Sequence, residues 1–193
     1  MDTEVYFPSL RRARITNVAA ASKTFAEKAA WEFVEKEKPN FTLATMNPPL
    51  VFGPIVHYLN SLDSLNTSNQ RVRDFMQGKA KDEIPDTGVY IWVDVRDLAT
   101  GHVAAMEKAE AANKRFFITA PTKFCNKDVI EIIRKNFPAY ADKLPSESAP
   151  GGRMPDAIFS VDTSQTVNIL GLKFRSLEAS ITDLVKSLQE AGA

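Results

Sequence analysis

The sequence has little of what several classes of protein require. Its 193 residues contain a single cysteine, Cys125, which excludes an internal disulfide and indicates a reducing compartment. There are 24 basic and 24 acidic side chains, so the net charge is zero and the charge predicts no attraction to nucleic acid or to an anionic membrane. No apolar run approaches the length of a membrane span. Hydrophobic residues make up 44% of the chain, which is typical of a soluble globular protein.

Signals for targeting and for metal binding are also missing. The first residues, Met1–Phe7, lack the basic start and apolar segment of a secretory signal, so we expect the protein in the cytoplasm. No spacing of histidine, cysteine and carboxylate residues suggests a metal site, and no metal is expected. The length is enough for one domain with a sizeable core and too short for two full domains.

Helix and strand signals alternate along the chain, which predicts the α/β class. Apolar residues recur at helical spacing over about five turns after Asn17 and before Pro39. A run of strand formers, Phe41–Met46, follows and ends at the doubled proline Pro48–Pro49, which cannot donate to a sheet ladder. We expect further helices over residues 67–77, 95–109, 127–136 and 177–191, a short helix ending at Gly171, and strands over residues 89–93, 114–119 and 158–161.

One part of the chain resembles the middle of an extended short-chain dehydrogenase/reductase. It reads Ser22-Lys23, then Phe25-Ala-Glu-Lys28, and later Asn47-Pro-Pro-Leu-Val-Phe-Gly-Pro54. The branch is that of fungal aldehyde and ketone reductases and of plant dihydroflavonol and cinnamoyl-CoA reductases. Val93-Asp-Val-Arg-Asp97 and Leu170-Gly-Leu172 match the same branch in the same order. The resemblance implies a truncated Rossmann-like α/β fold with a small sheet and packed helices.

Two departures from that family bear on function. The family's proton donor is a tyrosine four residues before the lysine, and here Ala19 stands at that position. The family's Gly-rich nucleotide-binding turn has no counterpart, because only a divergent arm without glycine, residues 1–16, precedes the reductase-derived domain, residues 17–193. We therefore expect no bound cofactor. The arm either covers surface that the absent half would bury or is a disordered tail.

Two residues are candidates for proton transfer in a reaction without a cofactor. His57 has an unperturbed pKa of about 6.5, which lets it gain or lose a proton at neutral pH. It lies just past the segment that, by resemblance, packs on the nicotinamide. Lys23 matches the family's lysine, whose role there is to hold the nicotinamide ribose. The competing interpretations are an exposed loop histidine and a lysine on a helix surface.

An apolar pocket is expected around the same segment. The candidate substrate-binding residues are Pro49, Val51, Phe52, Tyr58 and Trp92. Tyr90 and Trp92 alternate along a strand and face the same side of it, where they line the pocket or fill the core. Asp94, Arg96 and Asp97 are expected to cap a helix and to form an internal ion pair.

Two classes of function follow from these features. In the first, a reductase-derived protein without redox activity catalyses a cofactor-independent isomerisation, cyclisation or elimination of a small hydrophobic metabolite, for example in secondary metabolism. In the second, the chain is a non-catalytic remnant or a partner-binding module of an NADP-dependent ketone or aldehyde reductase. We prefer the first on sequence grounds. The unpaired edge of the strand Phe41–Met46 and the Ala-rich helix face also predict a homodimer.

Overall fold

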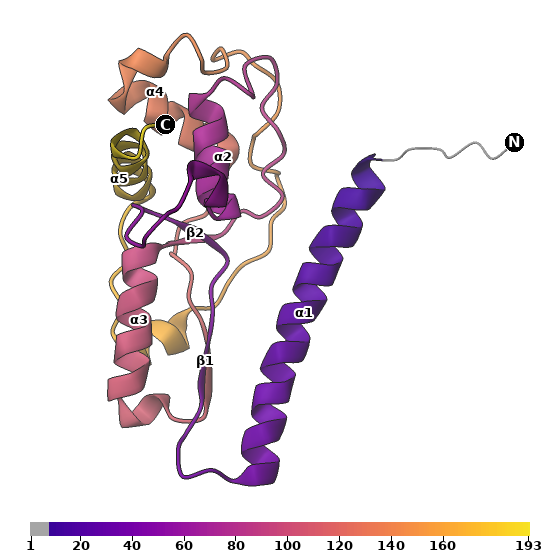
Figure 1. Cartoon of the computed structure of the whole chain (residues 1–193), viewed down its shortest axis with the longest axis vertical. Coiled ribbons are helices and arrows are strands. Elements are labelled where there is room, and N and C mark those ends of the chain that lie inside the picture. Colours follow the sequence, from indigo (N-terminus) through magenta and orange to yellow (C-terminus); the bar gives the residue numbers. More distant parts are fainter. Residues whose placement is uncertain (1–7) are drawn as a thin grey trace, which may run out of the picture.

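The structure is a computed structural model that describes the backbone of residues 8–193 and the side chains from residue 21 onward. Its main elements, in chain order, are helix α1 (Pro8–Glu37), strands β1 (Ala44–Asn47) and β2 (Leu50–Phe52), helix α2 (Thr67–Met76), strand β3 (Trp92–Asp94), helix α3 (Val95–Glu107), strand β4 (Lys114–Phe117), and helices α4 (Asn126–Asn136) and α5 (Leu177–Glu190). This arrangement confirms the predicted α/β class with a small sheet and packed helices (Figure 1).

The strands form two parallel pairs. β1 pairs with β4, with Ala44 opposite Lys114, and β2 pairs with β3, with Leu50 opposite Trp92. Within the described residues β1 has a strand neighbour on one side only. The segment after β4 joins the two pairs, because the N–H of residue 118 donates to the carbonyl of Asn47 (3.2 Å) and that of residue 120 to the carbonyl of Trp92 (2.7 Å).

Strand β3 separates two hydrophobic cores. Successive side chains of a strand point to opposite faces, so Trp92 enters one core and Val93 the other. The first core lies among α2, α4 and α5, and the second lies between α3 and the β1–β4 pair (Figure 1). The first contains Phe52, Phe75, Phe124, Ile181 and Leu184, and the second contains Phe116, Ile118 and Leu170.

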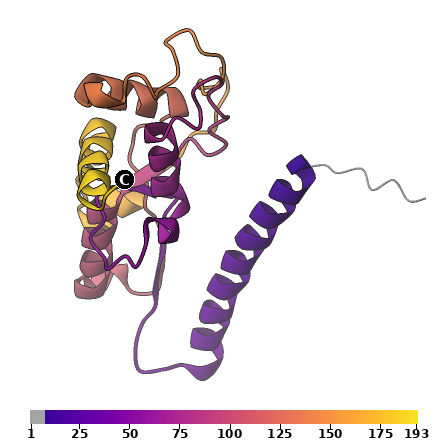
Figure 2. The same cartoon turned by 45° about the horizontal axis from the view of Figure 1, so that its top comes forward.

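Helix α1 stands beside this body and diverges from it in both views (Figures 1 and 2). Many of its side chains from residue 21 onward are exposed, including Phe25 at 68% and Phe33 at 51%. The helix begins at Pro8, earlier than the sequence predicts, because proline fits the first turn of a helix and good helix formers follow it. Residues 1–7 of the predicted arm lie outside the described residues, while residues 8–16 belong to α1. No helix of the described part is long and apolar enough to cross a membrane.

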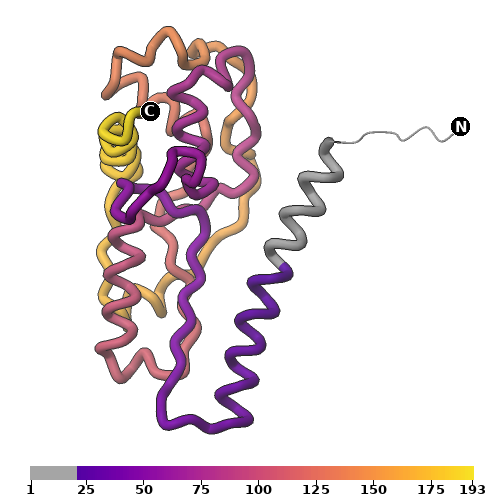
Figure 3. The backbone as a smooth tube through the Cα atoms, viewed as in Figure 1, coloured from indigo at the N-terminus to yellow at the C-terminus, as the bar shows by residue number. Residues whose placement is uncertain are grey.

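The predicted amphipathic helices are largely confirmed, with ends that differ by up to two residues. Helix α5 starts at Ser176, whose hydroxyl accepts a hydrogen bond from the N–H of Ala179, and it buries Ile181, Leu184, Val185 and Leu188 as expected. The predicted strand over residues 158–161 is wrong. That segment is irregular and leaves Phe159 56% exposed, because no neighbouring strand supplies a ladder for it. The course of the whole backbone can be followed in Figure 3.

A pair of matched substitutions tests the position of the first core. Phe52 is fully buried and Phe41 is 56% exposed, so the same truncation should have different effects. We expect Phe52→Ala to lower the free energy of unfolding by about 3–5 kcal/mol, because it removes buried apolar area and leaves a cavity. Phe41→Ala should change it little. Urea denaturation followed by circular dichroism measures both, and equal losses would contradict the described core.

Candidate functional site

The residues predicted to line a substrate pocket do not lie together around one pocket. Phe52 and Trp92 are both 0% exposed, and their ring centroids lie 6.4 Å apart. Phe124 packs edge-on against Phe52 with a centroid distance of 5.1 Å. Of the two alternatives for Trp92, the structure therefore supports a side chain that fills the core. Phe52 also fills this core, so neither Phe52 nor Trp92 lines the predicted substrate pocket.

The other predicted site residues lie at or near the surface. Tyr58 is 87% exposed, and His57 beside it and Lys23 on α1 are also exposed. Pro49, just before β2, and Val51, within β2, are half-buried. None of the contacts described for residues 21–193 joins Lys23 to His57. Their catalytic assignment stays a prediction.

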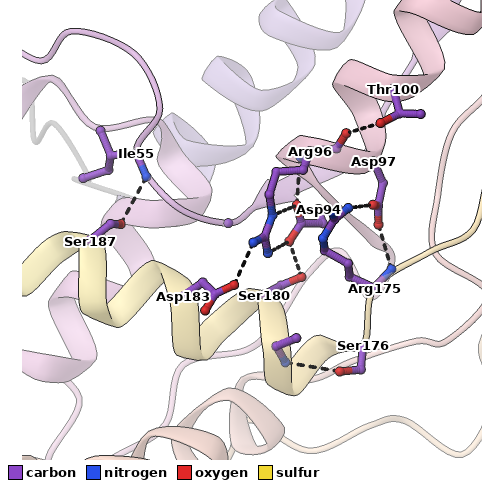
Figure 4. Close-up of polar contacts among 12 residues, drawn as sticks. Ile55, Asp94, Arg96, Asp97, Thr100, Arg175, Ser176, Ser180, Asp183 and Ser187 are labelled. Atoms are coloured by element: carbon purple, nitrogen blue, oxygen red, sulfur yellow. Dashed lines mark hydrogen bonds and ion pairs between the residues drawn. The ribbon is translucent and has the colours of Figure 1, made fainter.

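A network of charges joins β3, α3 and α5 (Figure 4). The carboxylate of Asp94 is fully buried and accepts two hydrogen bonds from the Arg96 guanidinium, from Nε at 2.9 Å and from Nη2 at 2.7 Å. The hydroxyl of Ser180 donates to the same carboxylate at 2.6 Å. Arg96 also reaches Asp183 on α5, with 2.7 Å between Nη1 and Oδ2. The predicted internal ion pair is thus confirmed, and Arg96 points to α5.

The charges of this network stabilise one another. Burial by itself would raise the pKa of Asp94, but hydrogen bonds from Arg96 and Ser180 outweigh it and hold the pKa below its ordinary value. The hydrogen bonds to Asp94 likewise raise the pKa of Arg96 above its ordinary value, so both groups stay charged at neutral pH. The Asp94 carboxylate also caps α3, because it accepts the N–H of Arg96 at 2.8 Å.

Asp97 has a different partner from the one expected. It is 2% exposed and accepts the backbone N–H of Arg175 at 2.7 Å, and its carboxylate also forms an ion pair with the Arg175 guanidinium. The sequence predicted that Asp97 takes part with Asp94 and Arg96 in a helix cap and an internal ion pair, and it did not indicate Arg175 as the partner. Arg175, Ser180 and Asp183 were not identified at all, since their partners lie about 80 positions earlier and no local spacing signals them.

Cys125 serves as a helix cap. Its side chain accepts from the backbone of Asp128, and the Asp128 carboxylate accepts the N–H of Cys125 at 2.7 Å. Burial raises the pKa of the Cys125 thiol, so it stays protonated and weakly nucleophilic at neutral pH.

Two of the hollows lined by described residues lie away from the predicted pocket. One of about 630 Å³ runs along α2, and its cations are already occupied: Lys79 pairs with Asp74 at 2.6 Å and Arg73 with Asp63 at 3.2 Å. Another of about 500 Å³ lies between β1 and α3, beside Met46. No group of three or more acidic, histidine or cysteine side chains among the described residues could hold a metal ion.

The described residues do not by themselves fit a dinucleotide. Proteins of this class usually seat the pyrophosphate on the free N-terminus of a helix that follows a strand through a Gly-rich turn. Here the junction from β3 to α3 is closed by Asp94, whose carboxylate already occupies the helix N-terminus and would repel a phosphate. The chain continues from β1 through Pro48 and Pro49 into β2 without a helix.

The buried ion pair of Asp94 predicts how the free energy of unfolding depends on pH. Asp94→Asn leaves Arg96 without its charged partner and should cost on the order of 3 kcal/mol at pH 7. Because the folded pKa of Asp94 lies below the unfolded one, the stabilisation is present at neutral pH and lost as the pH falls through the folded value. The difference in the free energy of unfolding between the parent protein and Asp94→Asn should therefore become smaller below a pH of about 4. Asp63→Asn is the control, since its ion pair is exposed and contributes little. Denaturation curves with a gap independent of pH would contradict this role.

Comparisons with known proteins show which proteins this chain resembles. The chain is 46% identical over 171 residues to the ketoreductase azaE of Aspergillus niger, which covers 88% of this chain and 50% of the relative. It is 35% identical over 170 residues to cinnamoyl-CoA reductase 2 of Arabidopsis thaliana, covering 88% of this chain and 47% of the relative. No protein-family model matches.

Solved structures agree with the sequence relatives. The yeast methylglyoxal/isovaleraldehyde reductase Gre2 complexed with NADPH superposes with a TM-score of 0.80 at 32% identity, over 91% of this chain and 52% of that one. The chain thus spans about half the length of the relatives it matches. These matches are consistent with the resemblance of the chain to a C-terminal portion of an extended short-chain dehydrogenase/reductase.

Proposed function

We propose that this chain is the substrate-side module of an NADPH-dependent reductase of ketones or aldehydes, and that it functions only together with a nucleotide-binding half. The relatives named above are reductases of carbonyl compounds, and this chain spans about half of each. The residues that the structure describes do not form a pyrophosphate seat. Cofactor binding would therefore come from a second body, either another chain or a preceding segment, and the proposed substrate class is a small hydrophobic carbonyl compound.

The single observation that carries the proposal is the open edge of β1. This strand pairs with β4 alone within the described residues. Thr45 and Asn47 on one face contact α1, and Ala44 and Met46 on the other face line the hollow beside α3. Parallel strands are normally covered on both faces and paired on both sides, so an open edge between two helices fits an added strand.

A cofactor-independent isomerisation, cyclisation or elimination is the competing function. It needs a pocket that gathers His57 or Lys23 with the apolar candidates. Phe52 and Trp92 are instead enclosed in a filled core, and Tyr58 points into solvent at 87% exposure. This arrangement favours the module, and the proposal for His57 and Lys23 as proton carriers is retained only as the alternative that activity measurements can test.

The same open edge and the exposed apolar face of α1 support a homodimer in the absence of a nucleotide-binding half. Phe25 and Phe33 expose 68% and 51% of their surface, and exposed apolar patches mark sites of association. We expect light scattering to show a dimer at tens of micromolar protein. Association through a weak apolar interface is largely complete at about this concentration. Phe33→Glu should shift it toward monomer, with Phe159→Glu as the exposed control. A monomer under all conditions would contradict this expectation.

A reconstitution experiment tests the proposed function itself. The chain alone should show no saturable NADPH binding at micromolar concentrations, which correspond to about 8 kcal/mol of binding free energy. Mixing it with the separately produced nucleotide-binding half of the Aspergillus niger ketoreductase should create a complex that binds NADPH more tightly than that half alone. Fluorescence titration of NADPH measures both. Carbonyl-dependent NADPH oxidation by the chain alone would overturn the proposal.

One substitution completes the design. Ala19 has a methyl group where the relatives' family has a proton-donating tyrosine, so the native mixture should bind NADPH and turn over slowly if at all. Ala19→Tyr should raise carbonyl reduction by at least about a hundredfold, the usual effect of a positioned acid. Ala19→Phe is the matched control, since it adds the ring without the hydroxyl. Equal rates for the two variants would show that the site is not assembled.

A further inference from the structure

One carboxylate joins the diverging helix α1 to the body. Glu27 extends from α1, and its Oε1 atom accepts hydrogen bonds from Thr45 at 2.9 Å and Asn47 at 3.3 Å, both on β1. Arg115 of β4 donates to the same oxygen from Nε at 2.8 Å. Trp31, one turn later on α1, donates its indole N–H at 3.5 Å. Two strands and the helix therefore meet at a single oxygen atom.

Glu27 is more buried than most of α1, whereas its partner Arg115 is 59% exposed. The Glu27 side chain is only 19% exposed although most of α1 around it is open to solvent. Burial by itself would raise the pKa of Glu27, but the hydrogen bonds from Arg115, Thr45, Trp31 and Asn47 outweigh it and lower the pKa below its ordinary value. The carboxylate is therefore charged at neutral pH and held by donors from both strands.

We infer that Glu27 is a positioning residue that sets the angle of α1 over the β1–β4 pair. Lys23 lies four residues earlier and so on the same side of the helix, one turn away from the anchor. Fixing Glu27 against Thr45 and Asn47 therefore also restrains Lys23 through the helix backbone. The part of the inference that concerns Lys23 rests on the proposed function, whereas the anchoring of α1 does not.

Few charged groups of the described residues lie around Glu27, so a pH-dependent change at this contact can be assigned to Glu27. Arg115 faces it from β4, Lys23 lies one turn before it on α1, and β1 presents the uncharged Thr45 and Asn47. A change in the position of α1 between neutral and acid pH would therefore follow protonation of Glu27.

The anchor can be tested on the chain alone by measuring distances between two spin labels. Cysteines at Ala21 on α1 and at Val103 on α3, both exposed, would carry the labels. Cys125→Ser removes the native thiol and keeps a side chain that can cap α4. At pH 7 we expect one narrow distance distribution. Glu27→Ala should replace it with a broad one, and Glu27→Gln should broaden it less, because the amide keeps an acceptor but loses the charge.

Controls separate this role from a general loss of helix stability. Glu32→Gln, an exposed change on the same helix, should leave the distribution narrow. Because the pKa of Glu27 is lowered in the folded protein, the distribution of the parent protein should broaden only well below the ordinary glutamate pKa of about 4.3, and that of Glu27→Gln should stay unchanged. If Glu27→Ala does not fold, the comparison of Glu27→Gln with Glu32→Gln decides the question. A narrow distribution in Glu27→Gln at pH 7, or the same pH response in both proteins, would overturn the inference.

A second readout addresses Lys23 in the reconstituted reductase with Ala19→Tyr. There Glu27→Gln should lower kcat several-fold with little change in KM, because it loosens the position of Lys23 without touching the apolar substrate contacts. An unchanged kcat would remove Lys23 from the inference. Absence of any turnover would count against the proposed function, while the distance measurement on the chain alone would still judge the anchor.

Discussion

The rest of the body depends on the hydrogen bonds that hold the buried carboxylate of Asp94. Removing a carboxylate from water costs several kcal/mol unless donors surround it, and here Arg96, Ser180 and the first turn of α3 supply them. Those donors come from two helices far apart in the sequence. The end of β3, the start of α3 and the middle of α5 must therefore come together for the protein to fold.

The position of β3 in turn organises the two cores. Once Asp94 is held at the end of the strand, Trp92 and Val93 point to opposite sides, and each side gathers its own apolar cluster. Asp97 repeats the same principle one turn later, because its buried carboxylate holds Arg175 at the entrance to α5. The signature Val93-Asp-Val-Arg-Asp97 thus acts as a structural junction between strand and helices, and its polar atoms are occupied by partners within the chain.

The opposite side of the molecule is organised differently. There β1 has a free edge among the described residues, and α1 meets the strands at Glu27 while most of its described side chains remain in solvent. A closed body next to an open strand edge is the arrangement expected of a part that completes a larger sheet. The contrast between the two sides is the physical basis of the proposed partner-dependent function, and Glu27 sets the geometry with which α1 would meet that partner.

What the sequence determined by itself are the features that depend on neighbouring residues. The periodicity of Ile181, Leu184, Val185 and Leu188 was enough to predict α5 and its buried face, and Ser176 and Asp94 were recognisable as caps, because these contacts span only a few positions. The motifs around Lys23 and Phe52 were likewise enough to indicate the reductase family. Only the tertiary structure decided that Phe52 and Trp92 fill a core, that Arg175 and Asp183 complete the charge network, and that Glu27 anchors α1. These pairings join residues from 18 to 88 positions apart, and no local spacing encodes which distant donor meets a buried carboxylate.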